Sequence, residues 1–378
     1  MRQPSLLWLV AIGLLAFGCA PWTDPLSYNP FKCIYPVEPK GSRELGFDIS
    51  YPASTLPRSL DRAIRLGGQF QVIRLDWNDI EGAGSGTTSG ALTDPGDVLA
   101  EASQTAVNTG MKVALVIDPI SREGNKVPDD LQETRFSAGR MRTRFKSLID
   151  FVLTKLPPGN ISVLVVGGEL DGYDSHGDAD VWTEYGLWLQ NVATYLKANY
   201  PTLKTAFGAS AHSLLSATEE LEAGVKSAET FLGYAAYVDV VGVNYDGLGA
   251  RLALKSPAEI PGDFALLTSR FTNEIHVLKL GYPSSEAAGT NADGQAWFYC
   301  EAMKAWDANR ARITKVAVDR LNDFDRNEAV RIAAIYGSTA ENFIEYLRSL
   351  GLVSSDGKSK QAYDILKEEL EEREFISD

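Results

Sequence analysis

The stretch "ISVLVVGGE" (161–169) is a run of apolar, mostly β-branched residues that ends in Gly-Gly-Glu. Such a run is typical of a strand buried on both faces, as in a parallel sheet covered by helices. Seven similar runs, each followed by a loop and a helical stretch, lie at 45–51, 70–77, 111–118, 203–210, 238–245, 275–282 and 313–320. The sequence therefore predicts eight strands that alternate with helices.

The segments between these strands show helical periodicity. In 140–156, one face carries Met141, Phe145, Leu148, Ile149, Val152 and Leu156, and the other, expected to be solvated, carries Arg140, Arg142, Arg144 and Lys146. Similar apolar stripes occur in 185–196, in 299–306 and in a terminal helix at 362–370. Eight β/α units predict an α/β fold of one domain, a (β/α)8 TIM barrel over 45–378. A doubly wound sheet is the alternative, but no Gly-rich phosphate turn follows the first strand.

The N-terminus has the features of an export signal. Residues 6–17 form an apolar run that is too short to span a bilayer, and "LLAFGC" resembles a bacterial lipobox in which Cys19 is lipidated. We expect residues 1–18 to be a lipoprotein signal peptide and 19–44 to be a tether. An ordinary cleaved signal peptide with an incidental cysteine is the alternative. In both cases we expect an exported protein. With a lipoprotein signal, the protein would be lipid-anchored to the bacterial cell envelope, on either its periplasmic or its surface side.

The other two cysteines, Cys33 and Cys300, form an even pair in an oxidising compartment. A disulfide between them and two unpaired cysteines are both open interpretations. With three histidines and no cluster with ligand spacing, we expect neither a metal site nor a cofactor.

The chain is acidic, with a net charge of −14 and a sequence pI of about 4.8. Binding nucleic acid requires a basic face, so the charge argues against such a partner. An acidic protein suits a neutral or weakly charged ligand, although acidity by itself concerns mainly solubility.

Polar and aromatic residues gather where the predicted strands end, which is where barrel proteins carry their functional residues. Carboxylates and amides bond sugar hydroxyls, and aromatic rings stack on the C–H faces of pyranoses. Taken together, these strand ends predict a site for an oligosaccharide or polysaccharide, formed by Asp48, Tyr51, Arg74, Trp77, Glu169, Asp171, His212, Asn244, Tyr245, Lys279 and Tyr282.

Several motifs resemble those of clan A glycoside hydrolases, and more closely a set of bacterial barrel proteins described as glycosyl hydrolases. "QVIRLDWNDIE" (71–81) is similar to their second strand, "LVVGGELDGY" (164–173) to the fourth, "YVDVVGVNYD" (237–246) to the sixth and "VLKLGYPSS" (277–285) to the seventh. The resemblance implies that Arg74 supports the nucleophile, that Glu169 is the acid/base and that Tyr245 or a neighbour lies beside the nucleophile.

Two positions depart from the family pattern. Gly168 replaces the asparagine that precedes the acid/base, and Lys279 stands where the nucleophilic glutamate belongs. A retaining glycosidase needs two carboxyl groups about 5–5.5 Å apart, and an ammonium group cannot replace one of them. Lys279 could instead pair with Glu169 or extend toward solvent from the strand end.

Three functions follow from these departures. The first is an exported carbohydrate-binding protein that has lost retaining catalysis. The second is an active hydrolase in which Glu169 is the acid and Asp171, Asp246, Glu286 or Asp319 is the nucleophile or the base, since inversion tolerates about 6.5–9.5 Å. The third and most remote is a lyase that forms a Schiff base through Lys279.

Overall fold

A computed structural model describes residues 33–50, 56–173, 180–216, 228–249 and 252–376. Eight parallel strands close into a barrel in the order β1-β10-β9-β8-β7-β6-β3-β2. The predicted TIM barrel is confirmed, with one observed strand in each predicted run. The strands are β1 (Glu44–Phe47), β2 (Phe70–Asp76), β3 (Lys112–Asp118), β6 (Ile161–Val166), β7 (Thr205–Ser210), β8 (Val240–Tyr245), β9 (Glu274–Leu280) and β10 (Ile313–Val318).

The strands are buried on both faces because one set of side chains fills the barrel and the other packs against helices. Val72, Val116, Val165, Val240 and Leu278 belong to a small interior cluster, and all are nearly inaccessible. The parallel register aligns the strand ends, pairing Asp76 with Asp118 and Asn244 with Lys279. Polar residues distant in sequence therefore lie at one end of the barrel, which we call the mouth.

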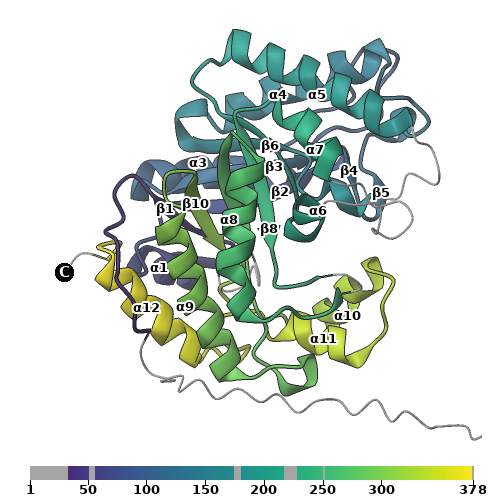
Figure 1. Ribbon diagram of the computed structural model, residues 1–378. Coiled ribbons are helices and arrows are strands. Elements are labelled where there is room, and N and C mark those ends of the chain that lie inside the picture. Colours follow the sequence, from purple (N-terminus) through teal and green to yellow (C-terminus); the bar gives the residue numbers. More distant parts are fainter. Residues whose placement is uncertain (1–32, 51–55, 174–179, 217–227, 250–251, 377–378) are drawn as a thin grey trace, which may run out of the picture.

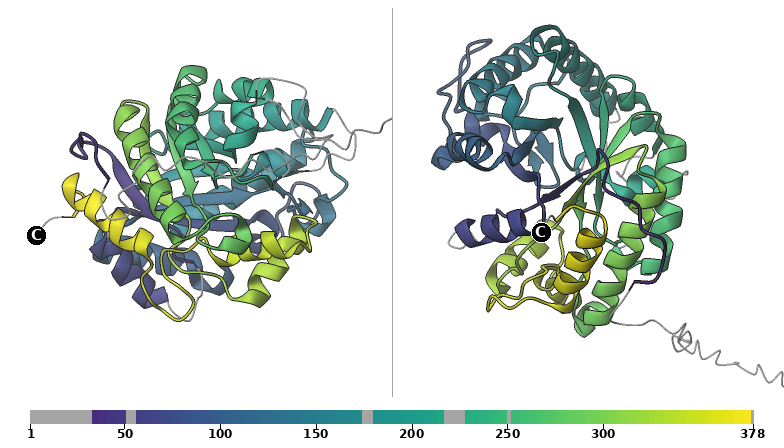
Figure 2. Two further views of the ribbon diagram at one scale, coloured as in Figure 1. Left: turned by 60° about the horizontal axis from the view of Figure 1, so that its bottom comes forward. Right: turned by 90° about the vertical axis from the view of Figure 1, so that its left-hand side faces the viewer.

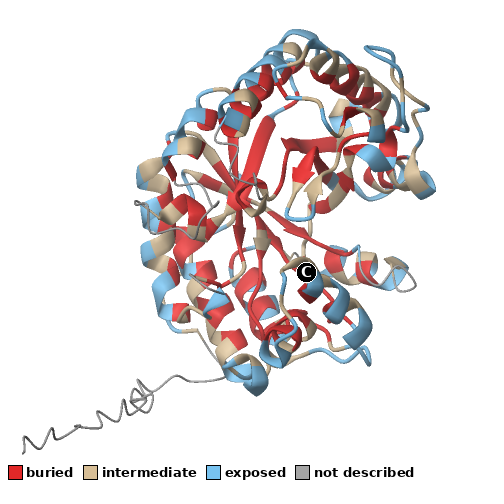
Figure 3. Cartoon of the chain, turned by 90° about the vertical axis from the view of Figure 1, so that its right-hand side faces the viewer, coloured by how far each residue is buried: buried red, intermediate tan, exposed pale blue. Residues whose placement is uncertain are grey.

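Helices surround the barrel, as the views in Figures 1 and 2 show. The outer layer consists of α1 (Leu56–Arg65), α3 (Val98–Thr109), α4 (Gly139–Lys155), α5 (Asp180–Asn199), α7 (Ala228–Ala235), α8 (Ile260–Arg270), α9 (Ala292–Ala308) and α12 (Gln361–Glu372). Short helices α2 (Trp77–Ile80) and α6 (Ala211–Leu215) follow β2 and β7, and the small strands β4 (Ile120–Ser121) and β5 (Gly124–Asn125) form a hairpin after β3. In Figure 3 the strands and the inner faces of the helices are buried, and the outer faces are exposed.

The apolar stripe predicted for α4 is buried as expected, but the opposite face is not uniformly solvated. Arg144 is fully buried, and its guanidinium is paired with Glu81 and Asp130. Glu81 also accepts a hydrogen bond from Trp77 Nε1 at 2.5 Å. The expectation that this arginine faces solvent was therefore wrong, because loop carboxylates reach over the helix and neutralise it.

Two helices that the sequence analysis did not assign, α10 (Arg326–Ile335) and α11 (Glu341–Arg348), lie between β10 and α12. Asp325 caps α10 by accepting a hydrogen bond from Glu328 N, and Gly337, with a φ of +66°, allows the turn that follows. We call residues 324–350 the cap. It has its own apolar cluster, including Phe324, Phe343 and Leu347. Figure 1 shows α10 and α11 beyond the end of β8, apart from α12.

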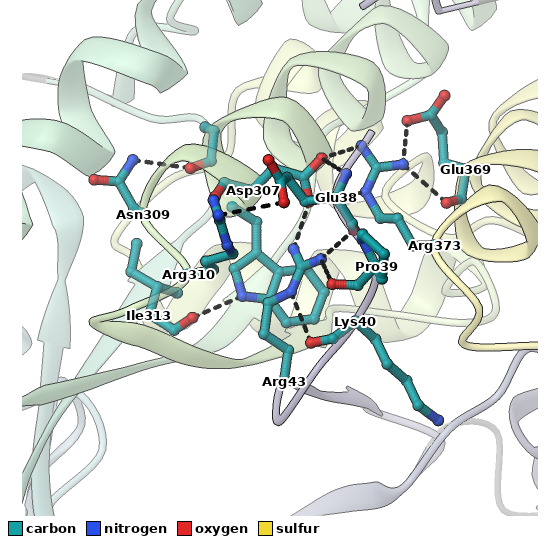
Figure 4. A network of polar contacts seen from close by, with 12 residues as sticks. Glu38, Pro39, Lys40, Arg43, Asp307, Asn309, Arg310, Ile313, Glu369 and Arg373 are labelled. Atoms are coloured by element: carbon teal, nitrogen blue, oxygen red, sulfur yellow. Dashed lines mark hydrogen bonds and ion pairs between the residues drawn. The ribbon is translucent and has the colours of Figure 1, made fainter. Parts of the chain in front are cut away.

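The N-terminal arm packs on the barrel body from Cys33 onward. Cys33 and Cys300 form a disulfide with a Cα–Cα distance of 5.7 Å. Arg43 donates to Asp307 at 2.5 Å, and Arg373 of the chain after α12 binds the same carboxylate at 2.7 Å (Figure 4). This part of the predicted tether is thus fixed to α9 and α12, whereas residues 1–32, including Cys19, lie outside the described residues. Within the described ranges, no helix has the length and apolar character needed to cross a membrane.

Candidate functional site

A cavity of about 310 Å³ lies at the mouth of the barrel. Its floor carries charged residues from the strand ends, among them Arg74, Asp118, Glu169, Asp246, Lys279 and Asp319. The cap supplies a mostly apolar wall that includes Phe324, Ile332, Tyr336, Phe343, Tyr346 and Leu347. The cavity therefore has one charged side and one apolar side.

Lys279 and Glu169 form an ion pair in the middle of this site, through Nζ and Oε1. Lys279 lies on β9 and Glu169 follows β6, so the barrel itself brings them together. Burial would raise the pKa of Glu169, but the charges of Lys279 and Arg74, the hydrogen bond from Lys279 and the charge of Arg122 outweigh it and lower the pKa to about 2. Glu169 is therefore ionised at neutral pH and has no proton to donate.

The structure explains why residue 168 is glycine. A Cβ at Gly168 would lie 2.5 Å from Arg74 Nη1 and 2.6 Å from Val116 Cγ1, so an asparagine side chain has no room there. Asn244 of β8 instead donates from Nδ2 to Gly168 O at 2.8 Å and accepts from Arg74 Nη2 at 3.4 Å. These bonds hold the backbone just before Glu169.

Two other carboxylates of the floor have perturbed acidity. Burial raises the pKa of Asp246 to about 7, against the hydrogen bond from Leu248 N and the charge of Lys279. Burial raises the pKa of Asp118 to about 6, although Arg74 and the hydrogen bond from Gly168 N oppose it. The floor therefore holds carboxyl groups of very different acidity, which is a feature common at functional sites.

Two cation–π contacts and one hydrogen bond join the cap to the floor and its loops. The Arg122 guanidinium lies 4.6 Å from the centre of the Tyr336 ring, and the Arg320 guanidinium lies 3.5 Å from that of Phe324. Tyr346 donates its hydroxyl hydrogen to Asp246 O at 2.6 Å. Tyr336 lines the same cavity as the ion pair, and the repulsive charge of Glu169, followed by burial, raises the pKa of Tyr336 well above its usual value.

Three aromatic residues predicted to bind sugar have their side chains elsewhere. Trp77 is fully buried against Phe145 and Trp188, because α2 turns it into the space between the barrel and the outer helices. Tyr245 faces outward and donates to Asp263 of α8 at 2.7 Å. Tyr282 donates to Lys255 O at 2.8 Å. In this structure these three side chains do not line the mouth cavity, and Tyr282 lines a neighbouring cavity instead.

Several predicted polar residues also serve local structure. Asp171 accepts hydrogen bonds from Ser210 and from Ser213 Oγ, and Asp48 accepts two from Ser50. His212 lies on α6, outside the lining of the mouth cavity. Tyr51 falls outside the described residues. Predicted residues that do line the cavity are Arg74, Glu169 and Lys279, while Asn244 lies directly beneath them.

Four carboxylates, Asp171, Asp246, Glu286 and Asp319, were candidates for the nucleophile or base of an active hydrolase, and two of them line the cavity. Asp246 and Asp319 do so, and Asp319 Oδ1 lies 3.7 Å from Arg320 Nη2. Asp171 is occupied by serine donors, as described above, and Glu286 is an exposed residue outside the cavity lining. Within the described ranges, no group of three or more His, Cys, Asp or Glu residues is arranged to hold a metal ion.

Sequence reasoning missed the contribution of the cap and of Arg122. Tyr336 and Phe343 lie in a segment without a strand signal, and Arg122 is in the turn of the β4–β5 hairpin that follows β3. The one available signal was a long insertion between β10 and the terminal helix, which in barrels extends the mouth.

No protein-family model and no curated protein matches the sequence. Solved structures are nevertheless similar in fold. An exo-β-1,4-mannosidase from Opitutaceae bacterium strain TAV5 is 15% identical with a TM-score of 0.64, and the similarity covers 87% of this chain and 59% of that one. A GH5_18 protein from Streptomyces cattleya in complex with GlcNAc is 15% identical with a TM-score of 0.62, covering 91% and 82%. A family 39 glycoside hydrolase from Bacteroides cellulosilyticus WH2 is 13% identical with a TM-score of 0.59, covering 91% and 66%.

The chain shares the (β/α)8 barrel fold of these structures. Its structural neighbours belong to glycoside hydrolase families 5, 39 and 2. It spans 59% of the length of the mannosidase. At these identities the likeness concerns the barrel and not the chemistry of its mouth.

Proposed function

We propose that this protein binds carbohydrate at the barrel mouth and does not hydrolyse it by the retaining mechanism of the glycosidases it resembles. The observation that carries the proposal is the ion pair between Lys279 and Glu169. Retaining hydrolysis needs a carboxylic acid that donates a proton and a carboxylate that attacks the anomeric carbon. Here the candidate acid is ionised and the attacking position holds an ammonium group.

The two walls of the cavity support carbohydrate binding. Charged groups of the floor, such as Asp246 and Arg74, can bond sugar hydroxyls, and the cap offers apolar side chains to the C–H face of a pyranose ring. A site with a few polar groups opposite an apolar wall fits an amphipathic ring better than a uniformly polar ligand.

We also propose that the mature protein is exported and anchored to the cell envelope through lipidated Cys19. The disulfide between Cys33 and Cys300 supports an oxidising compartment. Its position near the start of the described chain would connect the proposed anchor directly to α9. Mass spectrometry of the protein from membranes tests this, because a diacylglycerol on Cys19 as the first residue is expected, and an unmodified mature N-terminus would contradict it.

The functional test separates binding from turnover. Mannan oligosaccharides, N-acetylglucosamine oligosaccharides and oligogalacturonides, chosen from the sugars that the structural neighbours bind or cleave, are incubated with the protein. We expect at least one to bind and all to be recovered intact. Hydrolysis that is abolished by Glu169→Gln would refute the proposal.

A second candidate function, an active hydrolase with a displaced carboxylate, is favoured by one observation. Asp246 lines the same cavity as Glu169, and its raised pKa, about 7, keeps part of it protonated at neutral pH, as a general acid requires. Glu169 would then act as the base or nucleophile. Hydrolysis that is lost in Asp246→Asn would support this function and exclude the first.

The Schiff-base lyase is disfavoured by the same ion pair. Lys279 Nζ is bound to the Glu169 carboxylate, whereas a Schiff-base lysine must present its amine to a carbonyl carbon. Borohydride reduction with candidate carbonyl compounds should therefore trap no adduct on Lys279.

A further inference from the structure

Most cations that line the mouth cavity already have a carboxylate partner. Lys279 is paired with Glu169, and Arg331 holds Glu328 through two hydrogen bonds of 2.8 and 2.9 Å. Arg320 lies 3.7 Å from Asp319. These pairs neutralise one another and leave little charge for a ligand.

Arg122 is different. It lines the cavity, and within the described part of the chain it has no ion pair and no hydrogen bond to an acceptor. Its one specific contact is the Tyr336 ring, 4.6 Å from the guanidinium carbon. Because stacking uses the face of the guanidinium, the N–H groups along its edge stay available as donors, and the ring limits the orientation of the plane.

The carboxylates that line the cavity do not cancel this charge. Asp76 and Glu123 are both bound by Lys126, Glu169 is bound by Lys279 and Asp319 lies against Arg320. Asp118 accepts from Gly168 N, and Asp246 accepts from Leu248 N. None of these acids forms an ion pair with Arg122, although its charge reaches Glu169 and helps to lower that pKa.

Arg74 adds to the surplus of donors. Its Nε and Nη1 are buried and have no acceptor among the described residues, and Nη2 reaches only the Asn244 amide oxygen. Arg74 extends from β2 and Arg122 follows β4, and both line the same cavity as the Lys279–Glu169 pair. Arg74 and Arg122 thus each keep N–H groups that no carboxylate of the described residues accepts, although the cavity lining as a whole has six carboxylates and five cationic groups.

We propose that the carbohydrate is an acidic sugar whose carboxylate is bound by Arg122, with its ring between the Lys279–Glu169 pair and the cap. This inference rests on the proposed carbohydrate binding and names the substrate class of the same site. A carboxylate matches the edge of a guanidinium with two parallel hydrogen bonds, which a sugar hydroxyl cannot do. A sulfate ester offers the same charge with a different geometry and is tested as a separate arm.

The experiment compares matched pairs of ligands by calorimetric or NMR titration of the full mature chain. Digalacturonate and galactobiose form one pair, glucuronic acid and glucose another, and galactose 6-sulfate is the sulfate arm. We expect the uronates to bind about tenfold or more tighter than their neutral counterparts, since a hydrogen bond to a charged group contributes about 1.5–3 kcal/mol. Arg122→Gln should remove this preference while leaving the affinity for neutral sugars within about a factor of three.

Arg65→Gln is the matched control. It removes the same charge from an arginine on α1 that is exposed and paired with Asp61. If this variant lost the preference as strongly as Arg122→Gln, the effect would come from net charge, and the proposed role of Arg122 would be wrong.

Each other outcome decides one of the two proposals. Neutral sugars that bind as tightly as uronates would overturn the acidic-sugar inference and leave carbohydrate binding intact. Tighter binding of galactose 6-sulfate than of digalacturonate would show that Arg122 binds a sulfate ester and not a carboxylate. Absence of binding by any sugar of either class would overturn both proposals, provided that the variants and wild type unfold at the same temperature.

Discussion

Two clusters of charged residues in this protein use the same side-chain types and differ in how completely they are paired. Between the N-terminal arm, α9 and α12, Asp307 binds both Arg43 and Arg373, and Arg373 also binds Glu369 (Figure 4). Every nitrogen of the Arg43 guanidinium donates, to Asp307 or to backbone oxygens of residues 38–40.

The cluster at the mouth is not closed in this way. Lys279 and Glu169 are paired, but Arg74 has two nitrogens without an acceptor and Arg122 has no ion pair within the described ranges. Buried donors are normally satisfied, as they are in the arm cluster, which we therefore interpret as structural. We interpret the mouth cluster, where donors of Arg74 and Arg122 have no carboxylate partner among the described residues, as the binding site. The comparison predicts that mutations in the arm cluster change mainly the stability of the protein. Mutations in the mouth cluster should change mainly ligand binding and the pKa values of the mouth carboxyl groups.

The largest loss of stability should come from Asp307→Ala in the arm cluster, which consists of Arg43, Asp307, Glu369 and Arg373. It leaves Arg43 and Arg373 buried without their shared carboxylate, and removing one partner of a buried ion pair costs about 3–5 kcal/mol. Urea denaturation measures this loss. Asp356→Ala removes the same group from an exposed pair with Lys358 and should leave the midpoint unchanged. Equal urea midpoints for Asp307→Ala and Asp356→Ala would contradict the structural role of the arm cluster.

Asp246→Asn should change the free energy of unfolding by less than Asp307→Ala does, and it should stabilise the protein instead of destabilising it. Burial raises the pKa of Asp246 from 3.8 to about 7, so between these values the folded state binds more protons than the unfolded state. The wild type therefore loses stability as pH rises from about 4 to about 7, and the variant does not lose this contribution. The full shift would correspond to about 4 kcal/mol, and since Asp246 is partly exposed we expect about 1–2 kcal/mol.

Thermal denaturation of wild type and Asp246→Asn across this pH range provides the check. The two proteins should unfold at the same temperature near pH 4, and the variant at a higher one near pH 8. A variant that is less stable than wild type at the higher pH would show that the carboxylate of Asp246 is favourably paired, contrary to the account.

The smallest change in stability should follow Lys279→Met, because both members of the mouth ion pair are partly exposed, at 20% and 28%. We expect less than about 1 kcal/mol. The pKa of Glu169 should nevertheless rise clearly above its present value of about 2, since the charge of and the hydrogen bond from Lys279 are lost while burial continues to raise it. Side-chain carboxyl NMR titration reads this shift, and an unchanged pKa would mean that Arg74 and Arg122 suffice to hold Glu169 ionised.

The sequence predicted the barrel well because its strands are apolar on both faces. Val116, Val165 and Val240 fill the interior, and the residues beside them pack outward, so each strand appears as a continuous run. The contact between Lys279 and Glu169 could also be anticipated, because both residues come from strand ends at the same face of a barrel.

The direction of the side chains at the strand ends was harder to predict from the sequence. Trp77 and Tyr245 follow or end strands and were expected at the mouth, yet both point outward, because a shift of one residue along a strand changes the face. The cap was missed because α10 and α11 are two additional helices between β10 and α12, where the β/α repeat predicts a single helix. Arg144 was misjudged because its partners, Glu81 and Asp130, lie in distant loops.

The most direct test of the central claim is a single NMR experiment on the mature protein with digalacturonate. Saturation transfer reports binding, and the anomeric proton signals report cleavage in the same sample. The account predicts transfer to the sugar, weaker binding of digalacturonate by Arg122→Gln, down to the level of galactobiose, and no new anomeric signals during prolonged incubation. New reducing-end signals that vanish in Glu169→Gln would contradict it, because they would show that the carboxylate paired with Lys279 still carries out glycoside hydrolysis.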